Sequence, residues 1–223
     1  MDARRALLGR LFDHAAMFPP ASLRLDEALA EDDRARASEH AWLLGRFVVP
    51  EGVVVEDREV AIVSGGVERQ GDVEYVEGET KVRCGGQRVP SVEELADFVR
   101  RCRRAGLVFK ATAGLHHAYA TWAGSDSVEA AVARLETGVA ASGPGGSGEH
   151  GFLNLLAAVV FGDEEEALRA PRGSFALDER SFRWDGREAD APACARVRET
   201  LFHSIGSCSF FEPVGELEEL KIL

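Results

Sequence analysis

The sequence predicts one α/β domain over residues 1–223, built as a reduced or distorted (β/α) barrel with parallel strands. Strands and helices alternate along most of the chain, which favours a parallel sheet covered by helices. The best strands carry cations within apolar runs, which suits a barrel interior better than a sheet covered on both faces. The 223 residues are near the lower limit of about 200 for an eightfold barrel, so one or two strand-helix units are expected to be lost or replaced. An open parallel α/β sheet is the alternative.

The N-terminal third contains two predicted helices and several strands. Residues 3–16 have helical spacing, and the helix must end at Phe18-Pro19-Pro20 because proline cannot continue it. A second helix is expected over 25–40, and 42–50 form a buried strand. Only short strands fit between 51 and 79, at 53–55, 60–63 and 73–76.

Residues 80–113 predict a βαβ unit with two parallel strands. Strand 80–84 is followed by a capping box of Ser91 and Glu94. The next helix carries an apolar face suited to a sheet, formed by Leu95, Phe98, Val99 and Cys102. Strand 107–113 then completes the unit.

The C-terminal half continues the alternation. We expect helices at 126–141, 151–161 and 191–203, a flexible stretch at 142–148, a hairpin at 175–184, a last strand at 205–210 and a final helix from Glu212-Pro213.

The net charge of −12 disfavours nucleic acid and anionic membranes as partners. A pocket can still be locally positive, so a small anionic substrate is compatible with it. There is no apolar run of roughly 18 residues, and the first residues lack the apolar centre of a signal peptide, so a cytoplasmic protein is expected. A Val-rich edge in 51–79 could pair with a second copy, which leaves a homodimer open.

Four cysteines occur without a C-x-x-C pair, and we expect reduced, mostly buried thiols. Cys208 would be a nucleophile only if a nearby cation lowered its pKa.

Strand alternation places several cations on the inner face of the predicted barrel. Lys81 and Arg83 share one face of their strand, Lys110 lies beside Thr112, and Arg46 lies on the face of Val48. Together they would bind a substrate phosphate or carboxylate. In the alternative interpretation each cation pairs with an internal carboxylate or extends to solvent.

Lys110 is the candidate catalytic amine. Within an apolar strand and among other cations its pKa would be lowered, leaving a neutral amine able to form a Schiff base. His116 and His117 follow at the carboxyl end of that strand, where either could transfer protons at neutral pH.

Further candidates lie in the C-terminal half. His150 begins a helix with Asn154 one turn along, and the two would orient the substrate. Ser207 and Ser209 could wrap a phosphate, and Glu212 could accept a proton or orient a histidine.

A metal site is the second interpretation of the histidines. His116, His117 and His150, with Asp13 or Glu212, would suit zinc or iron. Adjacent histidines in an extended strand point to opposite sides, and no H-x-H or H-E-x-x-H spacing occurs. We therefore expect neither metal nor cofactor.

Two resemblances extend these expectations. Lys110-Ala111-Thr112-Ala113-Gly114 resembles the lysine strand of deoxyribose-phosphate aldolase, a class I aldolase, which implies a Schiff-base role for Lys110. The chain also resembles an uncharacterised bacterial family of hypothetical proteins through separate blocks, which are Phe12–Ala15 with Phe18–Pro20, Lys81–Gly86, Phe109–His117, His150–Asn154 and Gly206–Phe210 with Glu212-Pro213.

The second resemblance implies a barrel-like fold and marks a site, but it implies no reaction. The chain departs from that family at Cys84, where threonine is expected, at Phe211, where an acid is expected, and in a shortened stretch before Lys81. Loss of an acid beside Glu212 could remove a catalytic group, which would indicate a specialised or inactive member.

These observations support three hypotheses. The first is a lyase, similar to Schiff-base aldolases, that acts on a small anionic carbonyl compound. The second is a metal-dependent lyase or hydrolase that uses the histidines. The third is a non-catalytic anion-binding protein derived from a barrel enzyme.

Overall fold

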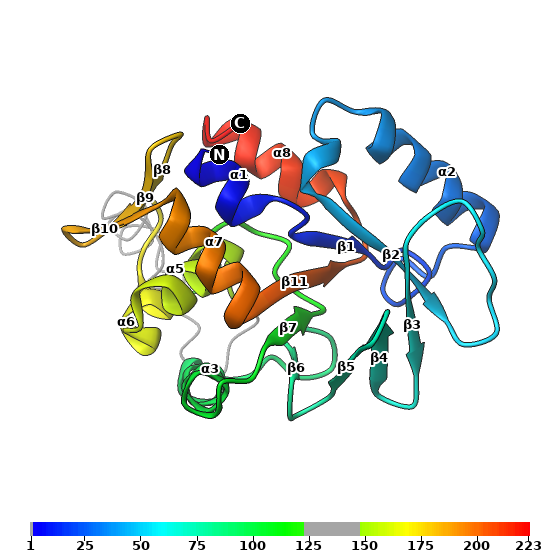
Figure 1. The fold of residues 1–223 in the computed structure, drawn as a ribbon, viewed down its shortest axis with the longest axis horizontal. Helices are drawn as coiled ribbons and strands as arrows, with labels where there is room; N and C mark the ends of the chain where they lie inside the picture. The colour runs from blue at the N-terminus through cyan, green and yellow to red at the C-terminus, as the bar shows by residue number, and fades with distance from the viewer. Residues whose placement is uncertain (1, 123–147) are drawn as a thin grey trace, which may run out of the picture.

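A computed structural model describes residues 2–122 and 148–223 (Figure 1). Its main feature is an eight-stranded sheet with the strand order β5-β4-β3-β2-β1-β11-β7-β6. The strands are β1 (Phe12–His14), β2 (Leu44–Pro50), β3 (Val60–Ser64), β4 (Val67–Gln70), β5 (Val73–Val76), β6 (Lys81–Arg83), β7 (Phe109–Thr112) and β11 (Phe202–Ser207).

The sheet curls into a nearly closed barrel. Strands β6, β7, β11, β1, β2 and β3 run parallel, whereas β4 is antiparallel to both of its neighbours, β3 and β5. A bridge between Glu77 and Lys81 joins the two ends of the sheet, and the Gly78 amide donates to the Lys81 carbonyl at 2.8 Å. The fold is thus a barrel-like α/β fold whose strands are mostly parallel.

Helices surround this barrel on the outside. In Figure 1, α2 flanks β2, α3 lies near β6 and β7, and α5 and α7 lie on the side of β11. A separate antiparallel sheet lies beyond α7, with strands β8 (Phe175–Leu177), β9 (Ser181–Trp184) and β10 (Arg187–Asp190). The described helices are α1 (Ala3–Leu8), α2 (Leu25–Ala37), the 3₁₀ turn η1 (Ala41–Leu43), α3 (Val92–Ala105), α5 (Phe152–Phe161), α6 (Glu164–Arg169), α7 (Ala191–Thr200) and α8 (Phe211–Glu219).

The apolar core fills the space between the barrel and these helices. Phe12 of β1 packs edge-on against Phe152 of α5, with ring centroids 5.4 Å apart. Phe109 of β7 contacts Phe98 of α3 and Phe202 of β11 at 5.2 and 5.0 Å. Because side chains alternate along a strand, the neighbours of these outward aromatics point into the barrel.

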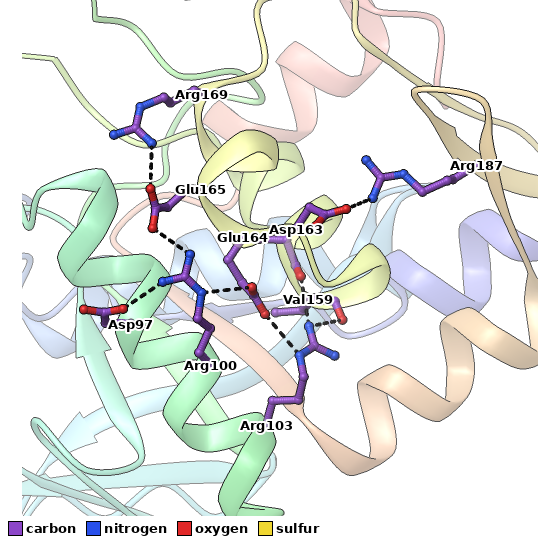
Figure 2. A network of polar contacts seen from close by, with 10 residues as sticks. Asp97, Arg100, Arg103, Val159, Asp163, Glu164, Glu165, Arg169 and Arg187 are labelled. Carbon is purple, nitrogen blue, oxygen red and sulfur yellow. Dashed lines mark hydrogen bonds and ion pairs between the residues drawn. The ribbon is translucent and has the colours of Figure 1, made fainter.

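Ion pairs hold α3 against α6 (Figure 2). Arg100 lies 3.4 Å from Glu164 and 2.6 Å from Glu165. Arg103 lies 3.1 Å from Glu164 and donates to the Val159 carbonyl at 3.0 Å. Glu164 is buried between the two guanidinium groups, so it is the centre of this network.

The predicted βαβ unit is confirmed. Strands β6 and β7 are parallel neighbours, with Lys81 opposite Lys110. Ser91 accepts from the Glu94 amide and Glu94 from the Ser91 amide, at 3.2 and 2.8 Å, so the capping box is also present.

The predicted helix over residues 3–16 is wrong beyond Leu8. The helix ends at Gly9, Arg10 adopts a φ of +52°, and Phe12–His14 form strand β1 instead. Parallel pairing with β2 and β11 on both sides favours the strand over another helical turn. A strand of three residues is too short to show the alternation of apolar and polar residues by which a strand is recognised in a sequence.

Residues 51–79 also differ from the prediction. Strands are present at Val60–Ser64 and Val73–Val76, but 53–55 is not a strand, and β4 (Val67–Gln70) was not predicted. The segment forms the antiparallel run β3-β4-β5, so the expectation of parallel strands throughout is corrected.

Smaller differences occur near the C-terminus. The last strand begins at Phe202 and ends at Ser207, so the predicted helix 191–203 ends earlier, at Thr200. The hairpin 175–184 gains a third strand, β10, and helix α6 was not predicted. The predicted helix 126–141 and residues 142–147 of the flexible stretch lie outside the described residues.

Among the described helices, none has both the length and the apolar character that a membrane crossing requires.

Candidate active site in the barrel

Four charged side chains meet inside the barrel, and we call them the charge cluster. They are Asp13 of β1, Glu68 of β4, Lys81 of β6 and Lys110 of β7, and all are buried. Lys110 Nζ lies 2.7 Å from Asp13 Oδ2 and also contacts Glu68 Oε1. Lys81 Nζ lies 3.0 Å from Glu68 Oε2. The two ammonium groups therefore balance the two carboxylates.

The order of residues along each strand produces this arrangement. Asp13 lies between Phe12 and His14, which face the surrounding helices, so its own side chain faces inward. Lys110 lies between Phe109 and Ala111 in the same way. Strand β4 lies between β3 and β5 and brings Glu68 to Lys81 and Lys110 inside the barrel.

Neutral groups complete the hydrogen bonding of Asp13. Oδ2 accepts from Gln70 Nε2 at 2.9 Å and from Ser204 Oγ at 2.6 Å, and Oδ1 accepts from the Arg46 amide at 2.7 Å. Gly45 leaves space for this carboxylate, because a Cβ there would lie 2.2 Å from Asp13 Oδ1. Each carboxylate oxygen of Asp13 therefore accepts at least one hydrogen bond from the chain, which fixes the orientation of the side chain.

The charges in the cluster stabilise one another. Burial alone would lower the pKa of Lys110, but the adjacent Asp13 and Glu68 carboxylates outweigh it and raise that pKa above its ordinary value. Burial would raise the pKa of Asp13 and of Glu68, but Lys110 holds the pKa of each below its ordinary value. The expected lowering of the Lys110 pKa is therefore corrected, since its neighbours are carboxylates rather than further cations.

The amino end of the barrel forms a second polar layer. Tyr75 contacts His203 Nδ1 through its hydroxyl, and burial raises the pKa of Tyr75 to about 12. Arg198 donates to the Phe202 carbonyl at 3.0 Å, and burial lowers its pKa to about 10. A cavity of about 180 Å³ lies here, lined by Arg10, Asp13, Gly45, Arg46, Arg198, His203 and Ser204.

A second cavity of about 130 Å³ lies at the carboxyl ends of the parallel strands, and we call it the mouth cavity. Its polar wall contains Glu68, Lys81, Arg83, Thr112 and His116. The rest of its lining is apolar or small and consists of Ala15, Phe18, Pro19, Pro20, Val48, Val63, Ala113, Gly206 and Cys208. Active sites of barrel enzymes lie at this end of the strands.

Three of the residues predicted for the site therefore line the mouth cavity, namely Lys81, Arg83 and His116. Arg83 is exposed and has no ion pair or hydrogen bond with any residue that the structure describes. Lys110 does not line the cavity and is completely buried, and its ammonium contacts Asp13, Glu68 and the ring of Tyr75.

Both histidines after β7 contact helix α8. His116 Nδ1 lies 3.1 Å from Glu212 Oε2, without the alignment of a hydrogen bond. His117 Nδ1 lies 2.6 Å from Glu216 Oε1, and the Ala118 amide donates to Oε2 of the same carboxylate at 2.6 Å. His117 thus anchors the loop, whereas His116 faces the mouth cavity. The two residues do not continue the strand, so the expected opposite orientation does not apply.

His150 and Asn154 have structural contacts away from the mouth cavity. His150 Nε2 lies 2.8 Å from the Pro90 carbonyl. Asn154 Oδ1 accepts from the Ala120 amide at 3.0 Å, and its Nδ2 donates to carbonyls in and after α6. These partners account for the buried polar atoms of Asn154 without a ligand.

Ser207, the last residue of β11, and Ser209 after it form hydrogen bonds with the chain itself. Ser207 Oγ donates to the Ser209 carbonyl at 2.7 Å, and Ser209 Oγ accepts from the Glu212 amide at 3.4 Å. Cys208 lines the mouth cavity, but burial raises the pKa of its thiol, which opposes a nucleophilic role. All four cysteines are free thiols, and Cys84, Cys102 and Cys194 are buried.

The loop after β7 is strained. Ala113, Gly114 and Leu115 all have positive φ values of 56°, 64° and 57°. Gly114 touches the end of β6 so closely that a Cβ on it would lie 2.6 Å from the Cys84 carbonyl oxygen. Left-handed backbone of this kind is costly for residues with a Cβ and clusters at functional sites.

Metal ligation receives no support from the described geometry. No group of three or more His, Cys, Asp and Glu side chains within residues 2–122 and 148–223 is placed to hold a metal ion. His116 and His117 contact Glu212 and Glu216 of α8, whereas His150 contacts the Pro90 carbonyl, so the three histidines do not share one set of partners.

Phe211 and Cys84, where an acid and a threonine were expected, have other surroundings in the structure. Phe211 is partly exposed beneath Arg34, whose guanidinium carbon lies 5.7 Å from the ring centroid. Cys84 is completely buried in the apolar core. Neither residue lines the mouth cavity.

Sequence reasoning missed Glu68, Gln70 and Glu216. Glu68 and Gln70 alternate with Val67 and Arg69 along β4, which is the same signal that identified Lys81 and Arg83. Nothing in the sequence indicated that α8 would contact the loop after β7.

The fold and the site together define a barrel-like α/β protein with a charged interior and a small polar cavity at the carboxyl ends of its strands. No family model, no curated protein and no solved structure matches the chain.

Proposed function

We propose that the protein is a lyase that acts on a small anionic carbonyl compound in the mouth cavity. The observation that carries this proposal is the convergence of Lys81, Arg83 and His116 on one small cavity at the carboxyl ends of parallel strands. Arg83 would bind the anion, and Lys81 and His116 would act on the carbonyl group.

The use of lysine supports this proposal. Lysine accounts for only three of the 26 Lys and Arg residues, at positions 81, 110 and 221. Two of the three are buried inside the barrel, whereas the chain uses arginine for its other cations. Lysine differs from arginine in being able to lose its proton and attack a carbonyl, so amine chemistry explains this choice.

The geometry favours Lys81 over Lys110 as the reacting amine. Lys81 lines the mouth cavity, and its Nζ lies 3.0 Å from Glu68 Oε2, which can accept a proton from it. The neutral amine would add to the substrate carbonyl carbon, and loss of water would give a protonated imine. That cation would draw in the electron pair of an adjacent C–C or C–H bond as the bond breaks.

The other groups have supporting roles in this proposal. His116 would transfer the proton to or from the substrate, and Glu212 at 3.1 Å would orient its ring. Water would then hydrolyse the imine, releasing product and restoring Lys81. Lys110 would be a positioning residue that holds Glu68 toward Lys81.

The barrel itself supports an origin from a larger barrel enzyme. We propose that it is a reduced (β/α) barrel in which the antiparallel run β3-β4-β5 replaces strand-helix units. The segment 51–79 contains no helix and supplies Glu68 to the site, so the replacement would have retained the closed interior.

Borohydride trapping tests the proposed reaction. The protein would be incubated with small aldehydes and 2-oxo acids, reduced, and analysed by intact mass and peptide mapping. We expect one adduct at Lys81 and its loss in Lys81→Met, whereas the exposed Lys221 serves as the internal control for non-specific reaction.

The other outcomes separate the alternatives. An adduct at Lys110 would identify this residue, on the neighbouring strand β7, as the reacting amine in place of Lys81. An adduct only at Lys221 would overturn the proposal. Stoichiometric zinc or iron without an adduct would favour the metal-dependent hypothesis. Binding without an adduct or turnover would favour the anion-binding protein.

A further inference from the structure

We infer that the mouth cavity selects a monocarboxylate with a short apolar chain and excludes phosphorylated compounds, with Arg83 as the carboxylate-binding residue. This inference deepens the proposed function and rests on the same cavity. It follows from the charge balance of the site, the division of its walls and its size.

The charge balance leaves one cation for a ligand. Within the charge cluster, two carboxylates face two ammonium groups, so the floor of the cavity is neutral overall. Arg83 is the remaining arginine or lysine in the cavity lining, and it has no partner among the described residues. Its planar guanidinium matches the two oxygens of a carboxylate.

A ligand with two negative charges would be disfavoured, because the site carries negative charges of its own. Glu68 lines the floor of the cavity, and Glu212 lies behind His116 at 3.1 Å, so both add negative potential. One unpaired guanidinium can neutralise only one negative charge of the ligand. A second desolvated charge without a partner is costly, which disfavours phosphate monoesters.

The walls divide the ligand into two parts. Phe18, Val48 and Val63 of the cavity lining belong to one apolar cluster, and Pro19 and Pro20 follow Phe18 in the sequence, so the lining has an apolar part besides its cations. An apolar surface of this kind binds hydrocarbon better than hydroxyl groups, because hydroxyls would lose their hydrogen bonds to water there. The ligand should therefore carry its charge at one end only.

The volume limits the length of the chain. The cavity measures about 130 Å³, against about 30 Å³ for one water molecule in the liquid. Cavities for drug-sized ligands are typically about 300 Å³ or more. The site therefore suits a compound of a few non-hydrogen atoms, such as a short 2-oxo acid, better than a sugar phosphate.

Isothermal titration calorimetry with unreactive probes tests this inference independently of catalysis. Butyrate has the charge and the chain but no carbonyl for an imine, butyramide has the same shape without the charge, and propylphosphonate at pH 9 has two charges. We expect butyrate to bind about tenfold to a hundredfold more tightly than butyramide, which is the usual contribution of a charged hydrogen bond. Propylphosphonate should bind more weakly than butyrate.

The variants Arg83→Gln and Arg88→Gln form the matched pair. Both arginines are exposed and lie five positions apart, but Arg88 pairs with Glu94 and does not line the cavity. Arg83→Gln should reduce butyrate affinity at least about tenfold and leave butyramide unchanged, whereas Arg88→Gln should change neither. Affinity should also rise from acetate to butyrate and fall again for octanoate.

Each contrary outcome is distinct from failure of the proposed function. Equal or tighter binding of propylphosphonate, no butyrate binding, or unchanged butyrate binding in Arg83→Gln would each overturn the inference. Butyrate binding that depends on Arg83, without any borohydride adduct, would support the inference and remove the lyase proposal. An adduct with neutral aldehydes and no butyrate binding would overturn the inference and leave the proposed amine chemistry supported.

Discussion

Lys110 Nζ lies 2.7 Å from Asp13 Oδ2 in the centre of the barrel, and neither residue is appreciably exposed to solvent. The residues are 97 positions apart in the sequence, so this pair joins the N-terminal strand β1 to β7 across the barrel. The ammonium and the carboxylate are both removed from water here, and the attraction between them offsets the cost of this desolvation. The pair therefore contributes to stability as well as to the proposed site.

Replacing Lys110 by methionine should destabilise the fold strongly. The substitution leaves Asp13 and Glu68 buried with only Lys81 to balance them, and breaking such a buried pair costs about 3–5 kcal/mol. Urea denaturation followed by circular dichroism measures the loss. Lys221→Met on the exposed C-terminal segment is the control and should change the free energy of unfolding by less than about 0.5 kcal/mol. Equal stabilities of the two variants would contradict the structural role of the pair.

The charge cluster should make stability dependent on pH at both extremes. The pKa values of Asp13 and Glu68 lie below their ordinary 3.8 and 4.5, so their contribution is complete above those values and is lost as the pH falls through the lowered ones. The pKa of Lys110 lies above its ordinary 10.5, so its contribution is complete below that value and is lost as the pH rises through the raised one. Urea midpoints recorded across the pH range should show this, and Glu68→Gln should reduce the acid-side dependence. A midpoint that rises on acidification below pH 4 would be inconsistent with these directions.

Strand alternation alone predicted the inward direction of Lys81, Lys110 and Arg46. It could not show what those cations would meet, because their partners Asp13, Glu68 and Gln70 come from strands that the sequence pattern did not identify. Strand β1 has only three residues, and the alternation of β4 extends over only four, in which the buried positions are the polar residues Glu68 and Gln70. Both interpretations are thus partly met: Lys81 and Lys110 pair with internal carboxylates, and Arg83 has no ion pair or hydrogen bond with a described residue.

The chemistry of a residue type likewise did not reveal its role. His150 and Asn154 suggested substrate contacts, yet their partners are carbonyl and amide groups of the chain. A buried polar side chain can form hydrogen bonds with the backbone of a loop or with a ligand. The residue type is the same in both cases, so the sequence does not distinguish them. His116 could be separated from His117 only once helix α8 was placed.

The two tyrosines of the chain should resist ionisation in the native state. Burial raises the pKa of Tyr75 to about 12 and also raises that of Tyr119. Absorbance at the phenolate band should therefore be small at pH 10.5 in the folded protein and large after unfolding in urea at the same pH. Tyr75→Phe should remove the component that titrates near 12. A native titration centred at the ordinary value of 10 would show that Tyr75 is accessible to solvent.

Glu164 should contribute more to stability than its neighbour Glu165. Glu164 is buried between Arg100 and Arg103, whereas Glu165 is only half-buried at its contacts with Arg100 and Arg169 (Figure 2). Loss of a buried charged partner costs about 1–3 kcal/mol or more, and an exposed pair contributes about 0–1 kcal/mol. Thermal and urea unfolding of Glu164→Ala and Glu165→Ala provide the comparison. A larger effect at Glu165 would contradict the central position of Glu164 in the network.

Gly114→Ala should disturb both stability and the mouth cavity, and Gly106→Ala is its matched control. The two glycines have nearly equal φ values of 64° and 63°, so the backbone cost of about 1–2 kcal/mol is shared. A Cβ at Gly114 would also lie 2.6 Å from the Cys84 carbonyl oxygen, whereas a Cβ at Gly106 would meet nothing within 4 Å. The excess loss of stability in Gly114→Ala over Gly106→Ala thus measures the close contact between the ends of β6 and β7. Arg83 is the last residue of β6, and His116 lies in the loop after β7, so a shift at this contact would displace both side chains. Butyrate binding should therefore weaken in Gly114→Ala and stay unchanged in Gly106→Ala. Equal effects of the two substitutions on binding would show that this contact does not position the cavity.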